Sequence, residues 1–290
     1  MKYTRLNHQN YLRLLSVGDI ITIALQIYLN KLKSYFSLSL IAHIWLIIPV
    51  YGWAKFLALS ALISRLAFGE LIGETAEKSL LGKQKINQRL GNFLFANFLL
   101  VTIVISVTFC LFLLTVLILV IFLQASSRLL EPSVLDKLNK SLAFVAIITV
   151  LLVTFAILFI FLLLIGIIYS RFFIVDLPLA IEDNMSPCKA LSRTWNLTNG
   201  FEFSVQWLLA IAFLITLPIQ IIDQIIIEFF DWSFNYFKYN NSFLETGIAI
   251  GFLLLTNAII MPFWQAIKAV LYYDIRNRRE GLGLGLKDSD

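Results

Sequence analysis

The chain has 290 residues, of which 59% are hydrophobic and only 14% are charged, and its formal net charge is +5. Soluble domains carry about 25% charged residues, so this composition excludes an ordinary soluble domain. The Lys and Arg residues flank apolar runs and form no basic stripe on a soluble fold, which excludes nucleic acid as a partner.

Long runs without Asp, Glu, Lys or Arg define the fold class. A helix needs about 20 apolar residues to cross the bilayer core, whereas barrel strands alternate in polarity over about 10 residues. The runs therefore predict an all-α, polytopic helical membrane protein. We expect one membrane domain over residues 1–280, with about six transmembrane helices and two cytoplasmic-side amphipathic helices, and then a flexible cytoplasmic tail over residues 281–290.

The first amphipathic helix is expected to begin at Ser16, because Ser16-Val17-Gly18-Asp19 resembles a capping box. Its polar residues share one narrow stripe, and most of the remaining circumference is apolar. This pattern is typical of a helix in the membrane interface. A helix packed against its own bundle has the same pattern, and the sequence leaves both interpretations open. The stripe consists of Asp19, Thr22, Gln26, Asn30 and Lys33.

The apolar block that follows is predicted to cross the membrane twice, as spans 35–50 and 54–72. The cluster Pro49-Val50-Tyr51-Gly52 lies between them and is typical of a helix break. The segments 1–33 and 65–89 each hold five Lys and Arg residues. Both should be cytoplasmic under the positive-inside rule, so the chain crosses an even number of times between them.

Four further spans are expected at about 92–123, 142–169, 203–227 and 246–272, where charged residues are absent or rare. The first two are about 30 residues long, which is roughly 45 Å and more than an upright helix needs. We expect them to tilt or to protrude. Basic residues after the last span favour cytoplasmic termini, although the loop at 124–141 carries three basic residues where an outward loop is expected.

The second amphipathic helix is predicted to begin at Ser186-Pro187 and to end at Asn199-Gly200. It resembles the first at a constant offset of 166 residues, as in Asn30 and Asn196. The sequence leaves open whether chance or an ancestral parallel duplication explains this similarity.

Polar residues inside the predicted spans are candidate functional groups. We interpret His43 as a hydrogen-bonded structural histidine, with a proton or metal role as the alternative. Asn257 and Gln265 are expected to hold helices together. Gln220, Asp223 and Gln224 share one helical face, and we interpret them as an interfacial cap at the outer end of their span rather than as an ion site.

Charged residues at the cytoplasmic ends of the spans form a second candidate group. They either converge into one charge network at the cytoplasmic rim or remain separate, solvated charges, and we favour the second interpretation. No paired-histidine metal motif, nucleophile elbow or phosphate loop is present, so we predict no catalytic residue, no metal site, no cofactor and no enzyme activity. The candidate rim charges are Arg65, Glu70, Arg171, Asp176, Asp274 and Arg276.

Three short motifs resemble a known family. The ending LYYDIRNRREGLGL at 271–284 is similar to a recurrent ending of bacterial membrane proteins of the glycerophosphodiester phosphodiesterase membrane-domain type. The segments LPLAIE at 177–182 and ALSRTWNLTNG at 190–200, and the opening LSVGD at 15–19, also resemble that family. The resemblance implies an all-helical membrane domain of about six spans. It does not imply phosphodiesterase activity, which in fused members belongs to a separate soluble barrel domain for which this chain has no room.

Our leading hypothesis is a non-enzymatic integral membrane protein that acts as a lipid-interacting or membrane-assembly component. Its expected partners are membrane lipid and other membrane proteins. Its expected location is the bacterial inner (plasma) membrane, with an internal membrane such as the thylakoid as the alternative. A small-solute transporter or channel is the rival hypothesis, and it requires a polar cavity lined by His43, Asn257 or Gln265. An intramembrane lipid enzyme that uses the rim charges is the least favoured.

Overall fold

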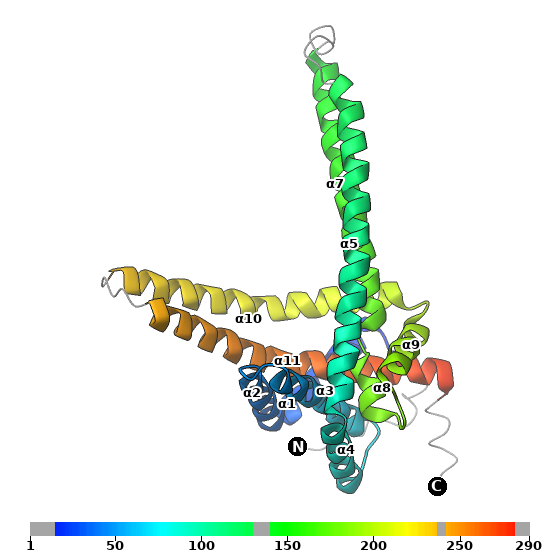
Figure 1. The fold of residues 1–290 in the computed structure, drawn as a ribbon, viewed down its shortest axis with the longest axis vertical. Coiled ribbons are helices and arrows are strands. Elements are labelled where there is room, and N and C mark those ends of the chain that lie inside the picture. Colours follow the sequence, from blue (N-terminus) through cyan, green and yellow to red (C-terminus); the bar gives the residue numbers. More distant parts are fainter. Residues whose placement is uncertain (1–14, 130–139, 237–241, 282–290) are drawn as a thin grey trace. The chain divides into compact units, whose positions relative to one another are not determined.

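The computed structural model describes residues 15–129, 140–236 and 242–281, and these residues form helices joined by short connections (Figure 1). No strand occurs within these ranges. The prediction of an all-α fold is confirmed. The helices are α1 Val17–Asn30, α2 Leu32–Trp45, α3 Tyr51–Leu71, α4 Ala76–Gln88, α5 Leu90–Leu129, α7 Lys140–Phe172, α8 Asp176–Ile181, α9 Pro187–Thr198, α10 Glu202–Tyr236 and α11 Ser242–Glu280.

Four helical stretches are long and apolar enough to cross a membrane, and they coincide with the four longer spans predicted from the sequence. Over its described residues the molecule is therefore an all-helical membrane protein with four candidate spans. The two shorter predicted spans correspond to α2 and α3. The 14 residues of α2 extend only about 21 Å, and the 21 residues of α3 include Lys55, Arg65 and Glu70. The four stretches are Leu90–Phe122, Ile147–Ile181, Glu202–Phe234 and Phe243–Glu280.

The break between α2 and α3 lies where the sequence predicts it. Helix α2 ends at Trp45, and α3 begins at Tyr51, after Val50 with a positive φ of 60°. A Cβ atom at residue 52 would lie only 1.9 Å from the carbonyl oxygen of Trp45, so this close approach requires glycine. The proline cluster therefore separates two helices.

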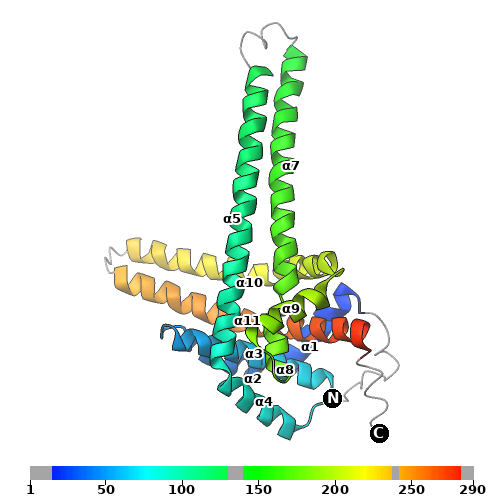
Figure 2. The same cartoon turned by 45° about the vertical axis from the view of Figure 1, so that its right-hand side comes forward.

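The chain divides into two compact units, which we describe separately. Unit 1 comprises Met1–Asn97 and Arg171–Asp290, and unit 2 comprises Phe98–Ser170. Unit 2 contains most of α5 and α7, which run alongside each other in both orientations of the molecule (Figures 1 and 2). Among its described residues only Ser170 is buried. Both helices expose many large apolar side chains.

Unit 1 is organised around the second half of α11, which packs against α1, α2, α3 and α10. Its core contains fully buried residues such as Ile63 of α3, Leu208 of α10 and Ile267 of α11. Small residues such as Ala61 and Ala269 are also fully buried and let helices approach closely. Beyond this core, α10 and α11 continue side by side as a pair to their shared free end (Figures 1 and 2).

Helices α1 and α9 begin where the sequence predicts. The Ser16 side chain accepts a hydrogen bond from the Asp19 amide at 3.2 Å, and the Asp19 carboxylate accepts one from the Ser16 amide at 2.9 Å, which completes the capping box. Helix α1 buries Ile20, Ile21, Ala24, Ile27 and Tyr28, so the helix packs against its own unit. Helix α9 begins at Pro187 after the Ser186 cap.

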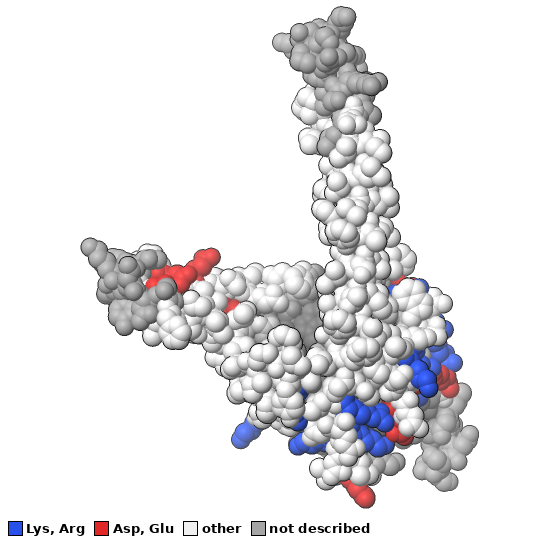
Figure 3. Space-filling model, viewed as in Figure 1, with Lys and Arg blue, Asp and Glu red and all other residues white. Residues whose placement is uncertain are grey.

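Charges in unit 1 separate along the α10/α11 pair. Lys268, Arg276, Arg278 and Arg279 lie in the last third of α11, whereas Glu228, Asp231 and Glu245 lie toward the opposite, free end of the pair. In Figure 3 one group of red atoms lies at that free end, and the blue atoms lie on the opposite part of unit 1 with further red atoms among them. The free end of the pair is therefore acidic, and the described basic residues of the pair all lie toward the opposite end.

Candidate functional site

The main polar cluster of unit 1 surrounds α9, and we call it the α9 cluster. Its members come from the last residues of α7, from the residue that follows α8, from α9 itself, from the start of α10 and from the end of α11. The chain leaves α9 through Gly200, whose φ of 79° favours glycine, and α10 begins two residues later at Glu202. This short turn brings Glu202 next to the end of α7.

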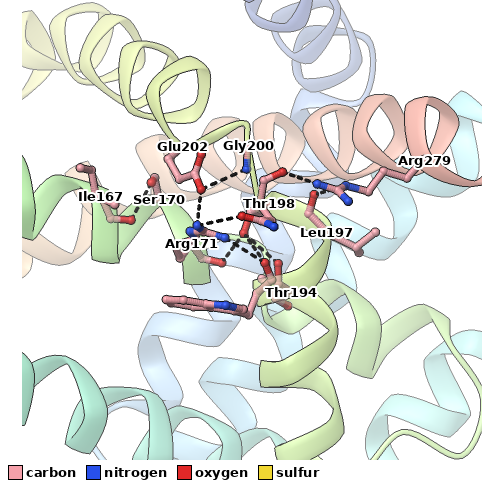
Figure 4. Close-up of polar contacts among 11 residues, drawn as sticks. Ile167, Ser170, Arg171, Thr194, Leu197, Thr198, Gly200, Glu202 and Arg279 are labelled. Atoms are coloured by element: carbon pink, nitrogen blue, oxygen red, sulfur yellow. Dashed lines mark hydrogen bonds and ion pairs between the residues drawn. The ribbon is translucent and has the colours of Figure 1, made fainter.

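Arg171 connects α7 to the end of α9 (Figure 4). Its guanidinium forms an ion pair with Glu202, donates to the Asn199 side chain at 3.1 Å and donates to the Trp195 carbonyl at 3.2 Å. It also lies over the Trp195 ring, 4.5 Å from the ring centroid. The Arg171 side chain is only 13% exposed. Such a desolvated, stacked and paired arginine positions helices strongly.

Arg279 reaches the same end of α9 from α11 (Figure 4). Its guanidinium donates to the Leu197 carbonyl at 2.9 Å and also to the Asn199 carbonyl. The last carbonyls of a helix lack partners within the helix and carry partial negative charge, so cations stabilise this end. Arg171 and Arg279 thus cap α9 from two different helices.

Arg193 forms the centre of a second group on α9. It pairs with Glu182 at 3.1 Å and with Glu280, and Glu182 also accepts a hydrogen bond from Tyr272 at 2.6 Å. Arg276 pairs with Glu280 at 2.9 Å. Burial acts to lower the pKa of Arg193, but the hydrogen bonds and charges of the two glutamates outweigh it and raise this pKa above its usual value. The group therefore remains an ionic network that joins α9 to α11.

The predicted rim charges mostly take partners that the sequence does not suggest. Arg65 forms a bidentate pair with Glu74 on the connection after α3, with both nitrogen–oxygen distances at 3.0 Å. Glu70 instead pairs with Lys31 at 2.9 Å and accepts a hydrogen bond from Tyr35.

The remaining rim charges also lie in separate pairs. Asp176 pairs with Lys268 at 3.1 Å, whereas Arg171, five residues before it, pairs with Glu202. Asp274 pairs with Arg278 at 2.7 Å and accepts the Leu15 amide at 3.2 Å. The six candidates are thus neither one converged network nor isolated solvated charges. Each has a partner, and only Arg171 and Arg276 belong to the two groups around α9.

The three polar residues expected inside spans make separate contacts. His43 is buried in α2, and its Nδ1 atom lies 2.8 Å from the Ser39 carbonyl oxygen. Gln265 of α11 accepts a hydrogen bond from Ser64 of α3 at 2.6 Å, which joins the two helices. Asn257 donates to the Leu253 carbonyl of its own helix at 2.8 Å. No hydrogen bond joins any two of the three in the described part of the chain.

The surroundings of Asp223 also could not be predicted from the sequence. It is buried on α10 and accepts a hydrogen bond from Thr256 of α11 at 2.8 Å. Its shared face with Gln220 and Gln224 is visible in the sequence. The register in which α11 packs against α10 is not visible there, because no local pattern encodes it.

Comparisons with known proteins give no assignment, since no family model, curated protein or solved structure matches this chain. Within the described ranges, no group of three or more His, Cys, Asp or Glu side chains is arranged to hold a metal ion. The class that the fold of residues 15–129, 140–236 and 242–281 defines is therefore an all-helical membrane protein, with four candidate spans in these ranges.

Proposed function

We propose that this chain is a non-enzymatic integral membrane protein that acts as a lipid-contacting assembly component. It lies in the bacterial plasma membrane or an internal membrane such as the thylakoid, with about six crossings, α2 and α3 being the two short ones. Its relation to the glycerophosphodiester phosphodiesterase membrane-domain family belongs to the same proposal, because only the three sequence motifs support it.

The observation that carries this proposal is the apolar surface of unit 2. Phe155 and Phe159 of α7 stack on each other at a centroid distance of 6.4 Å, yet they are 69% and 51% exposed. Soluble monomers rarely expose large contiguous apolar patches, so lipid or an apolar partner must cover this surface. The described helices of unit 2 carry almost no charged side chain that could bind a polar ligand.

The charge distribution of unit 1 supports cytoplasmic termini. Basic residues gather in the last third of α11, and acidic residues gather at the free end of the α10/α11 pair. Under the positive-inside rule the basic end faces the cytoplasm. The segment from Lys268 to the chain end then lies on that side.

The α9 cluster supports a structural role for the conspicuous charges. Arg171 is held by Glu202 and Asn199, and Arg193 is held by Glu182 and Glu280. Groups engaged in this way join helices and stay in fixed positions. They support a scaffold that presents apolar helices to the membrane.

The test is the retention of lipid or protein through purification in a mild detergent, measured by native mass spectrometry. We expect the wild type to retain one or the other. The double variant Phe155→Ala/Phe159→Ala should lose much of it without a lower thermal stability, because the two side chains are 69% and 51% exposed and contribute little to a buried core. The control is Phe203→Ala, which removes an exposed ring from α10. A wild type that purifies as a bare monomer contradicts the proposal.

A transporter or channel is the second candidate, favoured by the buried carboxyl of Asp223 inside a candidate span. It requires a wet cavity near His43, Asn257 or Gln265. The variants His43→Cys, Asn257→Cys and Gln265→Cys, made without the native Cys110 and Cys188, test this directly. Reaction with a membrane-impermeant thiol reagent at these positions supports a cavity, and protection at all three excludes it.

A further inference from the structure

Two contacts define how α10 and α11 pack against each other. Thr256 donates to Asp223 at 2.8 Å, and the rings of Phe230 and Phe252 lie 5.5 Å apart between centroids. From Asp223 and Thr256, these two rings lie seven and four residues closer to the free end of the pair. The two helices are thus antiparallel, with Asp223 and Thr256 at one level.

This register staggers the apolar runs of the two helices. The charge-free run of α10 ends at Ile222, directly before Asp223. The charge-free run of α11 extends from Thr246 to Ile267, and Thr256 is the eleventh of its 22 residues. At 1.5 Å per residue, Thr256 lies roughly 15 Å from either end of that run. Asp223, which directly follows the charge-free run of its own helix, therefore lies beside the middle of the charge-free run of α11.

The carboxyl group of Asp223 is also shielded from water. The residue is only 4% exposed, and the one hydrogen bond that its carboxyl group makes in the described part of the chain comes from Thr256. The run of α11 matches the hydrocarbon thickness of about 30 Å. A membrane that covers this run encloses the carboxyl group as well.

No described basic side chain forms an ion pair with Asp223. Along α10 the next charged residues toward the free end are Glu228 and Asp231, which are negative. On α11 the nearest charged residues are Glu245 and Lys268, eleven and twelve positions from Thr256, and Lys268 already pairs with Asp176 at 3.1 Å. A carboxylate buried without a counter-charge is very costly in an apolar environment, so it needs a cation.

We propose that Asp223, hydrogen-bonded by Thr256, is a proton-binding site within the α10/α11 pair. A metal ion is a poor fit, because hard cations such as Mg²⁺ and Ca²⁺ take six or more oxygen ligands. Thr256 uses its hydroxyl as a donor to the carboxyl group, and no cluster of acidic, His or Cys ligands surrounds it among the described residues. A proton needs only the carboxyl oxygen. This site does not depend on the proposed assembly function.

The test is modification by dicyclohexylcarbodiimide, a reagent that enters the bilayer and reacts with protonated carboxyl groups. The acid O–H adds across one C=N bond of the reagent, and the adduct rearranges to a stable N-acylurea that peptide mass spectrometry locates. With the full-length protein in liposomes, we expect an adduct at Asp223 that declines as the pH rises. A water-soluble carbodiimide should modify the exposed Glu228 and Asp231 and spare Asp223.

The variants provide controls. Asp223→Asn should remove the adduct, and the matched change Asp231→Asn should leave it intact. Thr256→Val should shift the pH at which modification declines, whereas Thr256→Ser, which keeps the hydroxyl group, should not. If Asp223→Asn fails to fold, the pH series on the wild type still decides the question.

Three results overturn the proposal. One is an Asp223 that stays unmodified at every pH, which indicates a permanent carboxylate. Another is modification that is equal at every pH, which indicates a carboxyl group that never releases its proton. The third is protection by sodium when it replaces choline in the buffer, which indicates a site for an alkali cation.

Discussion

The helix pairs α5/α7 and α10/α11 differ in the length of their charge-free runs. The charge-free runs of α5 and α7 extend from Leu90 to Ser127 and from Ser141 to Ser170, or 38 and 30 residues. Those of α10 and α11 extend from Phe203 to Ile222 and from Thr246 to Ile267, or 20 and 22 residues. About 20 residues suffice for one crossing. The first pair exceeds that length, and the second matches it.

The two pairs also differ in what their side chains touch. In the α5/α7 pair only Ser170 is buried among the described residues of unit 2. The α10/α11 pair buries Leu208, Thr216 and Asp223 on α10, and its register depends on specific contacts. The long and largely exposed helices α5 and α7 are suited to contact lipid or a partner protein. The buried residues and fixed register of α10 and α11 are suited to a specific internal structure. Truncating a buried side chain of the α10/α11 pair should therefore lower stability more than truncating an exposed side chain of the α5/α7 pair.

The largest effect is expected where charged contacts join several helices of unit 1. Arg171→Ala leaves Glu202 without its partner and removes the contact with the Trp195 ring. Breaking one partner of a mostly buried ion pair costs about 3 kcal/mol. Equilibrium unfolding in detergent measures the loss. Arg171→Lys keeps the charge but not the stacked, forked geometry, so it should lie between the wild type and Arg171→Ala. Equal stability of all three would contradict this role.

The next effect compares core and surface isoleucines. Ile267→Ala creates a cavity in the fully buried core of unit 1, whereas Ile160→Ala shortens a side chain of α7 that is 56% exposed. We expect a loss of about 2 kcal/mol for the first, at the low end of the range for such truncations. The second should change stability very little. Similar losses for the two variants, measured by the same unfolding assay, would remove the distinction between the units.

The sequence predicts features that depend on neighbouring residues better than it predicts contacts between residues far apart in the chain. The four long spans follow from charge-free runs, and the start of α1 follows from Ser16 and Asp19, which are three residues apart. The partners of Arg171 and Asp176 are 31 and 92 residues away, and several acids and bases of equal chemistry compete for them. Local spacing carries no information about which of these acids and bases will pair, because tertiary packing decides it.

The depth of Asp223 in the membrane could likewise not be predicted from its own helix. Its position at the end of the apolar run of α10 predicts an interfacial residue. Its actual neighbour is Thr256, in the middle of the run of α11. The depth of a residue therefore depends on the packing register as well as on its own helix.

A smaller effect is expected at the link between α3 and α11. The Ser64 hydroxyl donates to Gln265 at 2.6 Å in a buried position. Hydrogen bonds between membrane helices contribute about 0.6 kcal/mol on average. Ser64→Ala should cost roughly that amount. The matched variant Ser233→Ala removes a hydroxyl of α10 that bonds only within its own helix, and it should leave thermal stability unchanged. A larger loss for Ser233→Ala would reverse the expected order.

The smallest effect is a pH dependence at the surface of unit 1. Asp183 pairs with Lys85 of α4 at 2.8 Å, and the hydrogen bond and the charge of this lysine lower the pKa of the Asp183 carboxyl below its usual value. A lowered pKa in the folded state stabilises the fold above the unfolded pKa, and this contribution disappears as the pH falls through the folded value. Because both groups are exposed, the effect should be slight. Asp183→Asn should flatten the acidic side of a stability–pH curve, and an unchanged curve would contradict the contribution.

The most direct test of the difference between the two pairs uses a native cysteine. Cys110 is exposed on α5, and it is the 21st of the 38 residues in the charge-free run. In the variant Cys188→Ser, a nitroxide label on Cys110 reports by electron paramagnetic resonance whether oxygen or a water-soluble nickel complex reaches it in liposomes. We expect a site sheltered from the nickel complex, since lipid or an apolar partner covers α5. Free access of the nickel complex would show that α5 lies in water and would contradict a membrane-embedded unit 2.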